Sequence, residues 1–320
     1  MTLRVDRPLS LSNIDIVPTI LDKRAAEDFW IDLSARGLTF NIDTLPFQYG
    51  HPVNISRDMS RRVTEGADLA ERLLQGKILS RGLTHHLNAH PIFFGSEQLN
   101  YPHINAILEQ RLKRGYRLPM VYDVIGARED DGSLGLKVME LHASPSNYIF
   151  WLETMLKAAK ISPDDKSTWV GEETPEYVLR KIKIELAGGH NITLIDSDLN
   201  PFFLGEHIPL AKILGDERSL PIRVQDIEYD EANQVYYHYR YLTDPATGFP
   251  VFGEDGAPIK SDERVEITHY ISRMHQPDLD SVAKTVKDTP IEQTVLQFFR
   301  DSDHVTPIWH PSWQNISDKN

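Results

Sequence analysis

Residues 120 to 142 read MVYDVIGAREDDGSLGLKVMELH, and this stretch carries the strongest fold signal in the chain. Apolar residues alternate with other residues in MVYDVIGA and again in LGLKVMELH, and an acidic segment with an Asp-Gly step separates the two runs. Period-two patterning on both sides of such a turn is typical of an antiparallel hairpin. We therefore predict two paired strands here.

The register of this hairpin sets two carboxylates against each other. If the turn is centred on Asp131-Gly132, Asp123 faces Glu140, and the apolar neighbours of both indicate burial. Buried like charges must be neutralised, share a proton or hold a cation. His142, two residues after Glu140, adds an imidazole on the same face. Such a set suits magnesium bound with substrate phosphates. The other interpretation is a register shifted by one or two residues, with solvated strand ends.

The rest of the chain predicts a mixed α+β and α/β fold. Apolar spacing predicts helices at about residues 19–36, 56–78, 102–114, 148–159 and 175–187. A strand at 191–196, a helix at 206–214 and a strand at 222–227 predict a parallel α/β unit, followed by a meander from 229 to 271 and a short helix after 291. We divide the chain into a mostly helical region (1–115), the hairpin with its helices (116–188), the α/β unit (189–290) and a last segment (291–320).

Composition excludes several classes of function. The formal net charge is -13, so the chain has no basic surface of the kind that binds nucleic acid or anionic membranes. No run approaches about 20 apolar residues, and the N-terminus lacks the apolar segment of a signal peptide, which favours a cytoplasmic protein. Because the chain has no Cys, oxygen or imidazole ligands must hold any metal.

The order of several motifs resembles one known family. Tyr122-Asp123 followed by 138-VMELHASP-145 is similar to the motif of circularly permuted ATP-grasp enzymes, the relatives of glutathionylspermidine and trypanothione synthetases. Downstream, 192-ITLID-196, the segment from Gly205 to Gly215 and 224-VQD-226 resemble the next α/β unit of that family. Near the end, 313-WQNISDKN-320 resembles the segment whose lysine, here Lys319, contacts the nucleotide phosphates.

The resemblance implies an ATP-grasp-like fold and an ATP-dependent carboxylate-amine ligase. In that family an Asp, a Glu and an Asn hold magnesium, ATP phosphorylates a carboxylate, and an amine attacks the acyl phosphate to form an amide. On this chain the resemblance implies Asp123, Glu140 and His142 as magnesium ligands, Lys319 as an ATP contact, and small carboxylate and amine molecules as substrates. The pattern gives no oligomeric state.

Three departures from the family leave alternatives open. Val121 stands where the family has an Arg that stabilises the transferred phosphoryl group, and His142 stands where it has Asn. The family also continues past the Lys319 position into a lobe with a second lysine and a Gly-rich loop. We therefore expect a fragment, a chain completed by a partner, or a chain without activity. A non-catalytic ATP-grasp-like scaffold that binds a small ligand or a protein is the second hypothesis.

Other candidate residues have plainer interpretations. His86 and His90 have the i, i+4 spacing of zinc ligands on a helix, and a metal-binding protein centred on histidines is a third hypothesis, although surface histidines fit the pattern better. Five further polar residues could face a substrate or a phosphate group: Asp196, Asp198, Glu206, His207 and Arg273. They could equally cap helices, interact with a helix dipole or form ion pairs. Phosphate-binding Gly-rich loops and the serine hydrolase motif are missing from the sequence.

Overall fold

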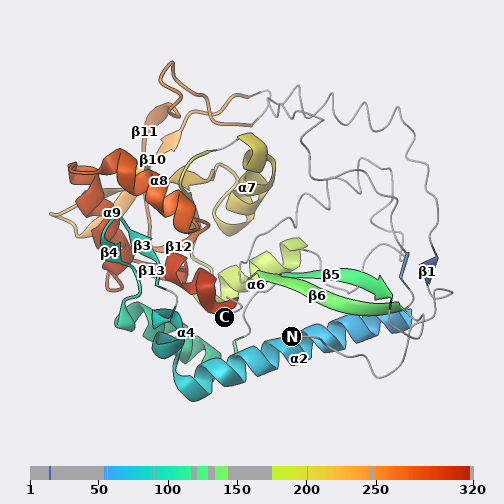
Figure 1. Cartoon of the computed structure of the whole chain (residues 1–320). Coiled ribbons are helices and arrows are strands. Elements are labelled where there is room, and N and C mark those ends of the chain that lie inside the picture. Colours follow the sequence, from blue (N-terminus) through green and yellow to red (C-terminus); the bar gives the residue numbers. More distant parts are fainter. Residues whose placement is uncertain are drawn as a thin grey trace.

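A computed structural model describes residues 14–15, 54–55, 57–89, 91–116, 121–128, 134–142, 175–199, 201–245 and 248–317 (Figure 1). For the hairpin strands at 121–128 and 134–142 it describes the backbone. Antiparallel and parallel strands both occur among these residues, which confirms the mixed α/β class. The helices predicted at 19–36 and 148–159 lie outside the described residues. None of the described helices is both long and apolar enough to cross a membrane.

The N-terminal described part is mainly helical. Helix α2 (Arg57–Arg81) and helix α4 (Pro102–Lys113) confirm the helices predicted at 56–78 and 102–114. Between them lie a short helix, α3 (Leu83–Asn88), and a small hairpin of β3 (Phe93–Phe94) and β4 (Glu97–Gln98). Two short strands before α2, β1 (Ile14–Asp15) and β2 (Asn54–Ile55), form a further antiparallel pair. Gly82 separates α2 from α3 at a φ of 81°, a conformation that residues with a Cβ adopt only with strain.

A four-stranded parallel sheet forms the centre of the C-terminal half, in the order β13-β12-β7-β8. Its strands are β7 (Ile192–Asp196), β8 (Ile222–Arg223), β12 (His269–Ser272) and β13 (Thr306–Trp309). Helix α6 (Pro175–Ala187) leads into β7, and α7 (Pro201–Leu214) connects β7 to β8. The predicted parallel strand-helix-strand unit is therefore confirmed.

Both faces of this sheet are buried, as expected of parallel strands. Ile192 and Leu194 of β7 join a core with α4 and α6, whereas Ile195 joins a second core. That second core includes residues of α8 (Gln276–Val286) and α9 (Pro290–Arg300), which connect β12 to β13. Helix α9 is the short helix expected after residue 291, and α8 was not predicted. Figure 1 shows these helices grouped around the sheet.

An antiparallel sheet follows β8 in sequence. It has the order β11-β10-β9, with β9 (Glu228–Asp230), β10 (Val235–Tyr241) and β11 (Lys260–Glu266). These strands confirm the first part of the predicted meander, but the last strand of that stretch, β12, pairs in the parallel sheet. The segment from 242 to 259, between β10 and β11, is called the arm below. It folds back on itself through the bridges Thr243 to Pro250 and Phe252 to Pro258.

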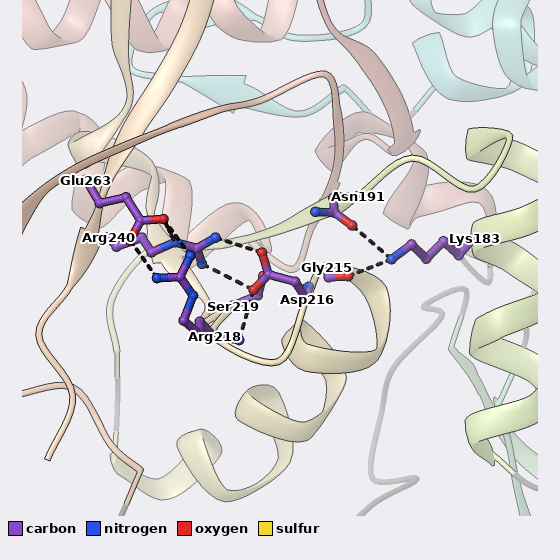
Figure 2. Close-up of polar contacts among 8 residues, drawn as sticks. All are labelled: Lys183, Asn191, Gly215, Asp216, Arg218, Ser219, Arg240 and Glu263. Carbon is purple, nitrogen blue, oxygen red and sulfur yellow. Dashed lines mark hydrogen bonds and ion pairs between the residues drawn. The ribbon is translucent and has the colours of Figure 1, made fainter. Parts of the chain in front are cut away.

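The corner between α7 and β8 is held by charges (Figure 2). Arg240 of β10 donates from Nη2 to Asp216 Oδ2 at 2.7 Å and from Nε to Glu263 Oε1 at 2.8 Å, and Arg218 forms a two-bonded pair with Glu263. On the other side of the corner, Lys183 of α6 donates to the Gly215 carbonyl at 2.6 Å. The corner is therefore tied both to the antiparallel sheet and to α6.

Two boundaries differ from the sequence prediction. Helix α7 begins at Pro201 rather than near residue 206, because a proline fits the first helical turn, where its missing N–H costs nothing. Strand β8 ends at Arg223, and residues Val224–Asp226 form a 3-10 turn, η3, instead of continuing the strand to Ile227. The side-chain pair between Arg223 and Asp226, three residues apart, fits this turn. The predicted division into four domains stays a prediction.

Candidate functional site

The hairpin has the predicted pairing at the two carboxylates. Strands β5 (Val121–Arg128) and β6 (Leu134–His142) are antiparallel, and Asp123 pairs with Glu140. The observed pairing has a register shift between Asp123 and Val124. Between this bulge and the turn, each pair is displaced by one residue from the pair expected for a turn centred on Asp131-Gly132. The bulge offsets that error, so the opposed pair is confirmed. The side chains of the predicted metal ligands Asp123, Glu140 and His142 lie outside the described ones, so magnesium binding stays a prediction.

The C-terminal segment comes to the same hairpin. Lys319 lies outside the described residues, but the 3-10 helix η4 (Pro311–Ser317), which ends two residues before it, lies against β6 (Figure 1). Helix η4 is held in place because the Trp313 indole Nε1 donates to Asn105 Oδ1 of α4 at 3.2 Å, and the Gln314 amide donates to the Met274 carbonyl. Tertiary structure thus brings two segments of the predicted site together.

A second group of polar side chains lies at the carboxyl edge of the parallel sheet. His207 of α7 and Asp196, the last residue of β7, form a pair with Nδ1 and Oδ2 3.1 Å apart, and their side chains are 4% and 13% exposed. Burial holds the pKa of His207 below its usual value despite the hydrogen bond with Asp196. The imidazole is therefore neutral near pH 7 and its Nδ1–H donates to the carboxylate.

Arg273 follows β12 at the same edge. Its main-chain N–H donates to the Ile195 carbonyl at 3.0 Å, which continues the pairing of β12 with β7, and its positive charge contributes to the low pKa of His207. Asp278 and Asp280, which follow Arg273 closely in the sequence, accept hydrogen bonds from the His275 main chain and the Gln276 amide respectively. The sequence thus identified Asp196 and Arg273 separately; the fold brings Asp196 into contact with His207 and Arg273 close enough for its charge to lower the pKa of His207.

The carboxyl end of β8 carries a charged network around Asp226. Its carboxylate accepts two hydrogen bonds from the Arg223 guanidinium and one from the Tyr241 hydroxyl at 2.7 Å, and Lys260 Nζ lies 3.2 Å away. The Tyr241 oxygen in turn accepts the Arg223 main-chain N–H at 3.0 Å. Burial alone would raise the pKa of Asp226, but these donors outweigh it and hold the pKa below the usual range.

A cavity of about 510 Å³ opens beside this network, within the range typical of small-molecule sites. Its described wall comes from the loop after β7, from the β8-η3 turn and from the arm. Polar and apolar side chains both contribute: Asp198, Arg223, Gln225, Leu199, Phe252 and Pro258. The cavity therefore lies outside the carboxyl ends of parallel strands, where α/β folds place ligands.

Sequence patterns located only part of this edge. Asp198 was singled out because it follows an apolar strand, but nothing in the local pattern identified Arg223, Gln225 or the arm. Glu206 and His207 were expected to begin a helix; they lie inside α7, so the dipole at a helix start is the wrong explanation for an acidic residue there. The burial of His207 could have been predicted from its position one helical turn before the apolar residues Leu210 and Ala211, which are also buried.

The histidine metal site stays a prediction. His90 and the side chain of His86 lie outside them, and the side chains that the structure does describe contain no group of three or more His, Cys, Asp or Glu able to hold a metal.

Fold and site together define a mixed α/β protein with polar groups along one sheet edge. The chain matches no protein-family profile and no curated protein. Three chains of solved structures are similar to it, among them a glutathione synthetase-like effector from Globodera pallida in its apo form. That similarity has a TM-score of 0.45 and 14% sequence identity and covers 97% of this chain. This chain spans 66% of the length of that protein. A similarity this weak carries no information about activity.

Proposed function

We propose that the chain is the scaffold of an ATP- and magnesium-dependent carboxylate-amine ligase, which forms an amide through an acyl phosphate. The observation that carries this proposal is the contact of η4 with β6. The motif resemblance assigns the metal to the hairpin and the nucleotide contact to Lys319. A ligase of this kind needs these two segments close together, because magnesium bridges the phosphates that the lysine contacts. The fold supports that requirement.

The donor chemistry of the hairpin fits magnesium in part. Asp123 and Glu140 occupy directly opposed positions, which in antiparallel pairs bring Cβ atoms to about 5 Å. Two carboxylates suit magnesium, which takes few protein ligands and keeps several waters. His142 is the less suitable member, because imidazole favours softer metals. Bound ATP would supply the phosphoryl group that activates a carboxylate. The carboxyl-edge cavity is the place we propose for a small substrate.

Calorimetric titration of the chain with ATP tests the proposal directly. We expect binding in the presence of magnesium that weakens at least about tenfold when EDTA removes the metal, since the metal neutralises phosphate charge. The variants Asp123→Asn and Glu140→Gln should lose this dependence on magnesium. Glu217→Gln removes one carboxylate from an exposed position outside the hairpin and is the matched control.

Two results would overturn the ligase proposal. The first is a chain that binds no ATP with magnesium present while circular dichroism shows it to be folded. The second is a Glu140→Gln variant with the same magnesium dependence as the parent and the Glu217→Gln control. A substrate screen by phosphate release is justified only if neither occurs.

A non-catalytic scaffold is the second proposal, and Val121 favours it. This residue occupies the strand position two before Asp123, where the resembling family has the Arg that stabilises the transferred phosphoryl group. Loss of such a cation lowers the rate of phosphoryl transfer by orders of magnitude. If the chain binds ATP but does not hydrolyse it, and Val121→Arg does not bring about hydrolysis, the scaffold proposal is favoured. If Val121→Arg gains ATP turnover, the result would favour a site derived from a ligase.

A further inference from the structure

Basic side chains gather at the amino edge of the parallel sheet, although the formal net charge of the chain is -13. Ile192 of β7 and Ile271 of β12 pack in the core that α4 and α6 cover. His190 and His269 precede these two residues by two positions, so they lie at the start of the strands on the same face. Arg111, in the last turn of α4, completes the group.

Arg111 is a partly buried cation without a carboxylate partner among the described residues. Its Nη1 donates to the Ile308 carbonyl of β13 at 3.3 Å, and the guanidinium lies over the Trp313 ring, 6.0 Å from the centroid. A guanidinium has five N–H donors, so most of them stay available to a ligand. Arg223 and Arg240 differ, because each pairs with a carboxylate. A desolvated charge without a counter-ion is costly, and a bound anion would offset that cost.

Two imidazoles lie beside this guanidinium. The rings of His190 and His269 are stacked, with centroids 5.5 Å apart and planes 11° apart. His269 is paired with Thr306 of β13, and Ile308, whose carbonyl contacts Arg111, is two residues or about 7 Å further along that strand. Burial and the charges of His190 and Arg111 all lower the pKa of His269. The three groups therefore lie close enough together for one anion to contact them.

Neighbouring polar contacts hold the two imidazoles in place. Thr268 Oγ1 lies 3.0 Å from His269 Nδ1, which leaves Nε2 for a ligand. The segment of His190 is fixed through the next residue, because Lys183 Nζ donates to Asn191 Oδ1 at 3.0 Å (Figure 2). A site whose side chains are already ordered loses less entropy when a ligand binds.

The carboxylates near this edge act on another group. Burial raises the pKa of the Tyr116 phenol, the Arg111 charge lowers it, and Glu185 and Glu71 raise it further. In the part of the chain that the structure describes, neither carboxylate forms an ion pair with Arg111 or with the imidazoles. A metal cation at the two imidazoles would be repelled by the guanidinium, whereas an anion would be attracted by it.

We propose that Arg111, His190 and His269 form a phosphate-binding site, which takes inorganic phosphate or the phosphate group of a small molecule. Arg111 and His269 Nε2 donate to the phosphate oxygens, and the exposed His190 ring adds a third contact. A phosphate group suits this arrangement better than a carboxylate, because its three oxygens accept from donors on several sides and it carries up to two negative charges. The site needs neither ATP nor magnesium and does not depend on the ligase proposal.

The test titrates the full chain with inorganic phosphate, glycerol phosphate and acetate at constant ionic strength, with EDTA and without ATP. Calorimetry gives the affinities, and NMR follows the imidazole resonances of His190 and His269. We expect the better phosphate compound to bind at least about tenfold more tightly than acetate and to shift both resonances with the same midpoint. Tighter binding of inorganic phosphate would identify the free ion as the ligand, and tighter binding of the ester would identify a phosphorylated molecule.

Variants separate a site from a general effect of charge. Arg111→Gln should weaken phosphate binding at least about tenfold, because it removes the fixed cation. Arg81→Gln, exposed at the end of α2, is the matched control and should bind as the parent does. His269→Ala should also weaken binding, and His85→Ala, exposed on α3, is its control. Circular dichroism shows whether each variant is folded; if Arg111→Gln is not, the His269 pair decides.

Three results would overturn the phosphate site. They are a folded chain that binds neither phosphate compound, acetate that binds as tightly as phosphate, and equal weakening by Arg111→Gln and Arg81→Gln. A chain that binds Zn²⁺ through the imidazoles but no phosphate would make this edge a metal site instead. Failure of the ligase proposal is distinct, because Glu140→Gln should leave phosphate binding without magnesium unchanged. A chain that binds phosphate but no magnesium-ATP keeps this site and loses the ligase.

Discussion

The Arg223 guanidinium holds the Asp226 carboxylate through two hydrogen bonds, Nε to Oδ2 at 2.7 Å and Nη2 to Oδ1 at 3.0 Å. The side chain of Asp226 is only 7% exposed, so its charge depends on these donors rather than on water. This pair fixes the end of β8 and one wall of the cavity. Stability and ligand binding should therefore both depend on it.

Asp226→Ala is expected to lower the free energy of unfolding by about 2–4 kcal/mol, because it leaves the partly buried Arg223 without its counter-ion. Urea denaturation followed by circular dichroism measures the change. Asp262→Ala removes an exposed carboxylate from the neighbouring strand β11 and should change stability by less than about 0.5 kcal/mol. Equal effects of the two substitutions would contradict the role of the pair.

Tyr241→Phe keeps the ring and removes the hydroxyl that donates to Asp226 Oδ2 and accepts from the Arg223 main-chain N–H. We expect a loss of about 1–2 kcal/mol, since a buried donor loses its acceptor. Combined with Asp226→Ala, the effect should be smaller than the sum of the two single changes, because both act on one network. Full additivity in the double-mutant cycle would show that the hydroxyl and the carboxylate act independently.

Buried histidines should make the fold sensitive to acid. His310 is fully buried; its Nδ1 accepts from the Ser312 main-chain N–H and lies 2.7 Å from the Ser312 hydroxyl, and its Nε2 lies 3.1 Å from the Phe299 carbonyl. Burial lowers its pKa from 6.5 to about 3. In that pH window the unfolded state binds a proton that the folded state does not, so stability falls as the pH drops from about 6.5 towards about 3.

The measurement for this pH dependence is the free energy of unfolding from pH 7 to pH 4 for the parent and for His310→Asn, which keeps an acceptor for Ser312. The variant should be less stable at pH 7, but its stability should fall less steeply with acid, by up to about 1.4 kcal/mol per pH unit for the one proton involved. His207 and His238, whose pKa values burial also lowers, keep some slope in both proteins. Parallel curves would mean that His310 does not contribute.

Gly215→Ala should destabilise the corner between α7 and β8. A Cβ at this position would clash with Ser219 Oγ and lie 2.9 Å from the Ala211 carbonyl oxygen, and Ser219 is itself hydrogen-bonded to Asp216 (Figure 2). We expect a loss of about 1–3 kcal/mol. Gly76→Ala in α2 is the matched control, because its Cβ would meet nothing within 4 Å. That change should stabilise the chain by about 0.5–1 kcal/mol, and thermal melting of both variants tests the opposite signs.

Trp313→Ala should loosen η4 from the core. The indole is fully buried, packs edge-on against Trp309 with ring centroids 5.9 Å apart, and donates to Asn105. We expect a loss of about 3–5 kcal/mol in chemical denaturation, with Trp313→Phe retaining much of the packing and losing less. If η4 positions the segment before Lys319, Trp313→Phe should also weaken any magnesium-dependent ATP binding. Unchanged ATP binding would separate η4 from the nucleotide site.

Several sequence predictions depended on local patterns, and those predictions are confirmed. The period-two alternation around residues 121–128 and 134–142 predicted both strands, whereas the predicted pairing of Asp123 with Glu140 is correct because a bulge offsets a one-residue error at the turn. Helical spacing predicted α2, α4 and α6 close to their observed bounds. Boundaries were less accurate where main-chain requirements compete with apolar spacing, as at Pro201 and after Arg223.

The sequence by itself determined the hairpin, the parallel strand-helix-strand unit and the residues of this chain that can carry charge at strand ends, because these depend on neighbours a few positions apart. Only the tertiary structure decided that η4 lies against β6, that His207 is buried against Asp196, and that the arm closes a cavity beside Arg223. The physical reason is that such contacts join segments far apart in the sequence, and their packing is set by the whole core rather than by any local period.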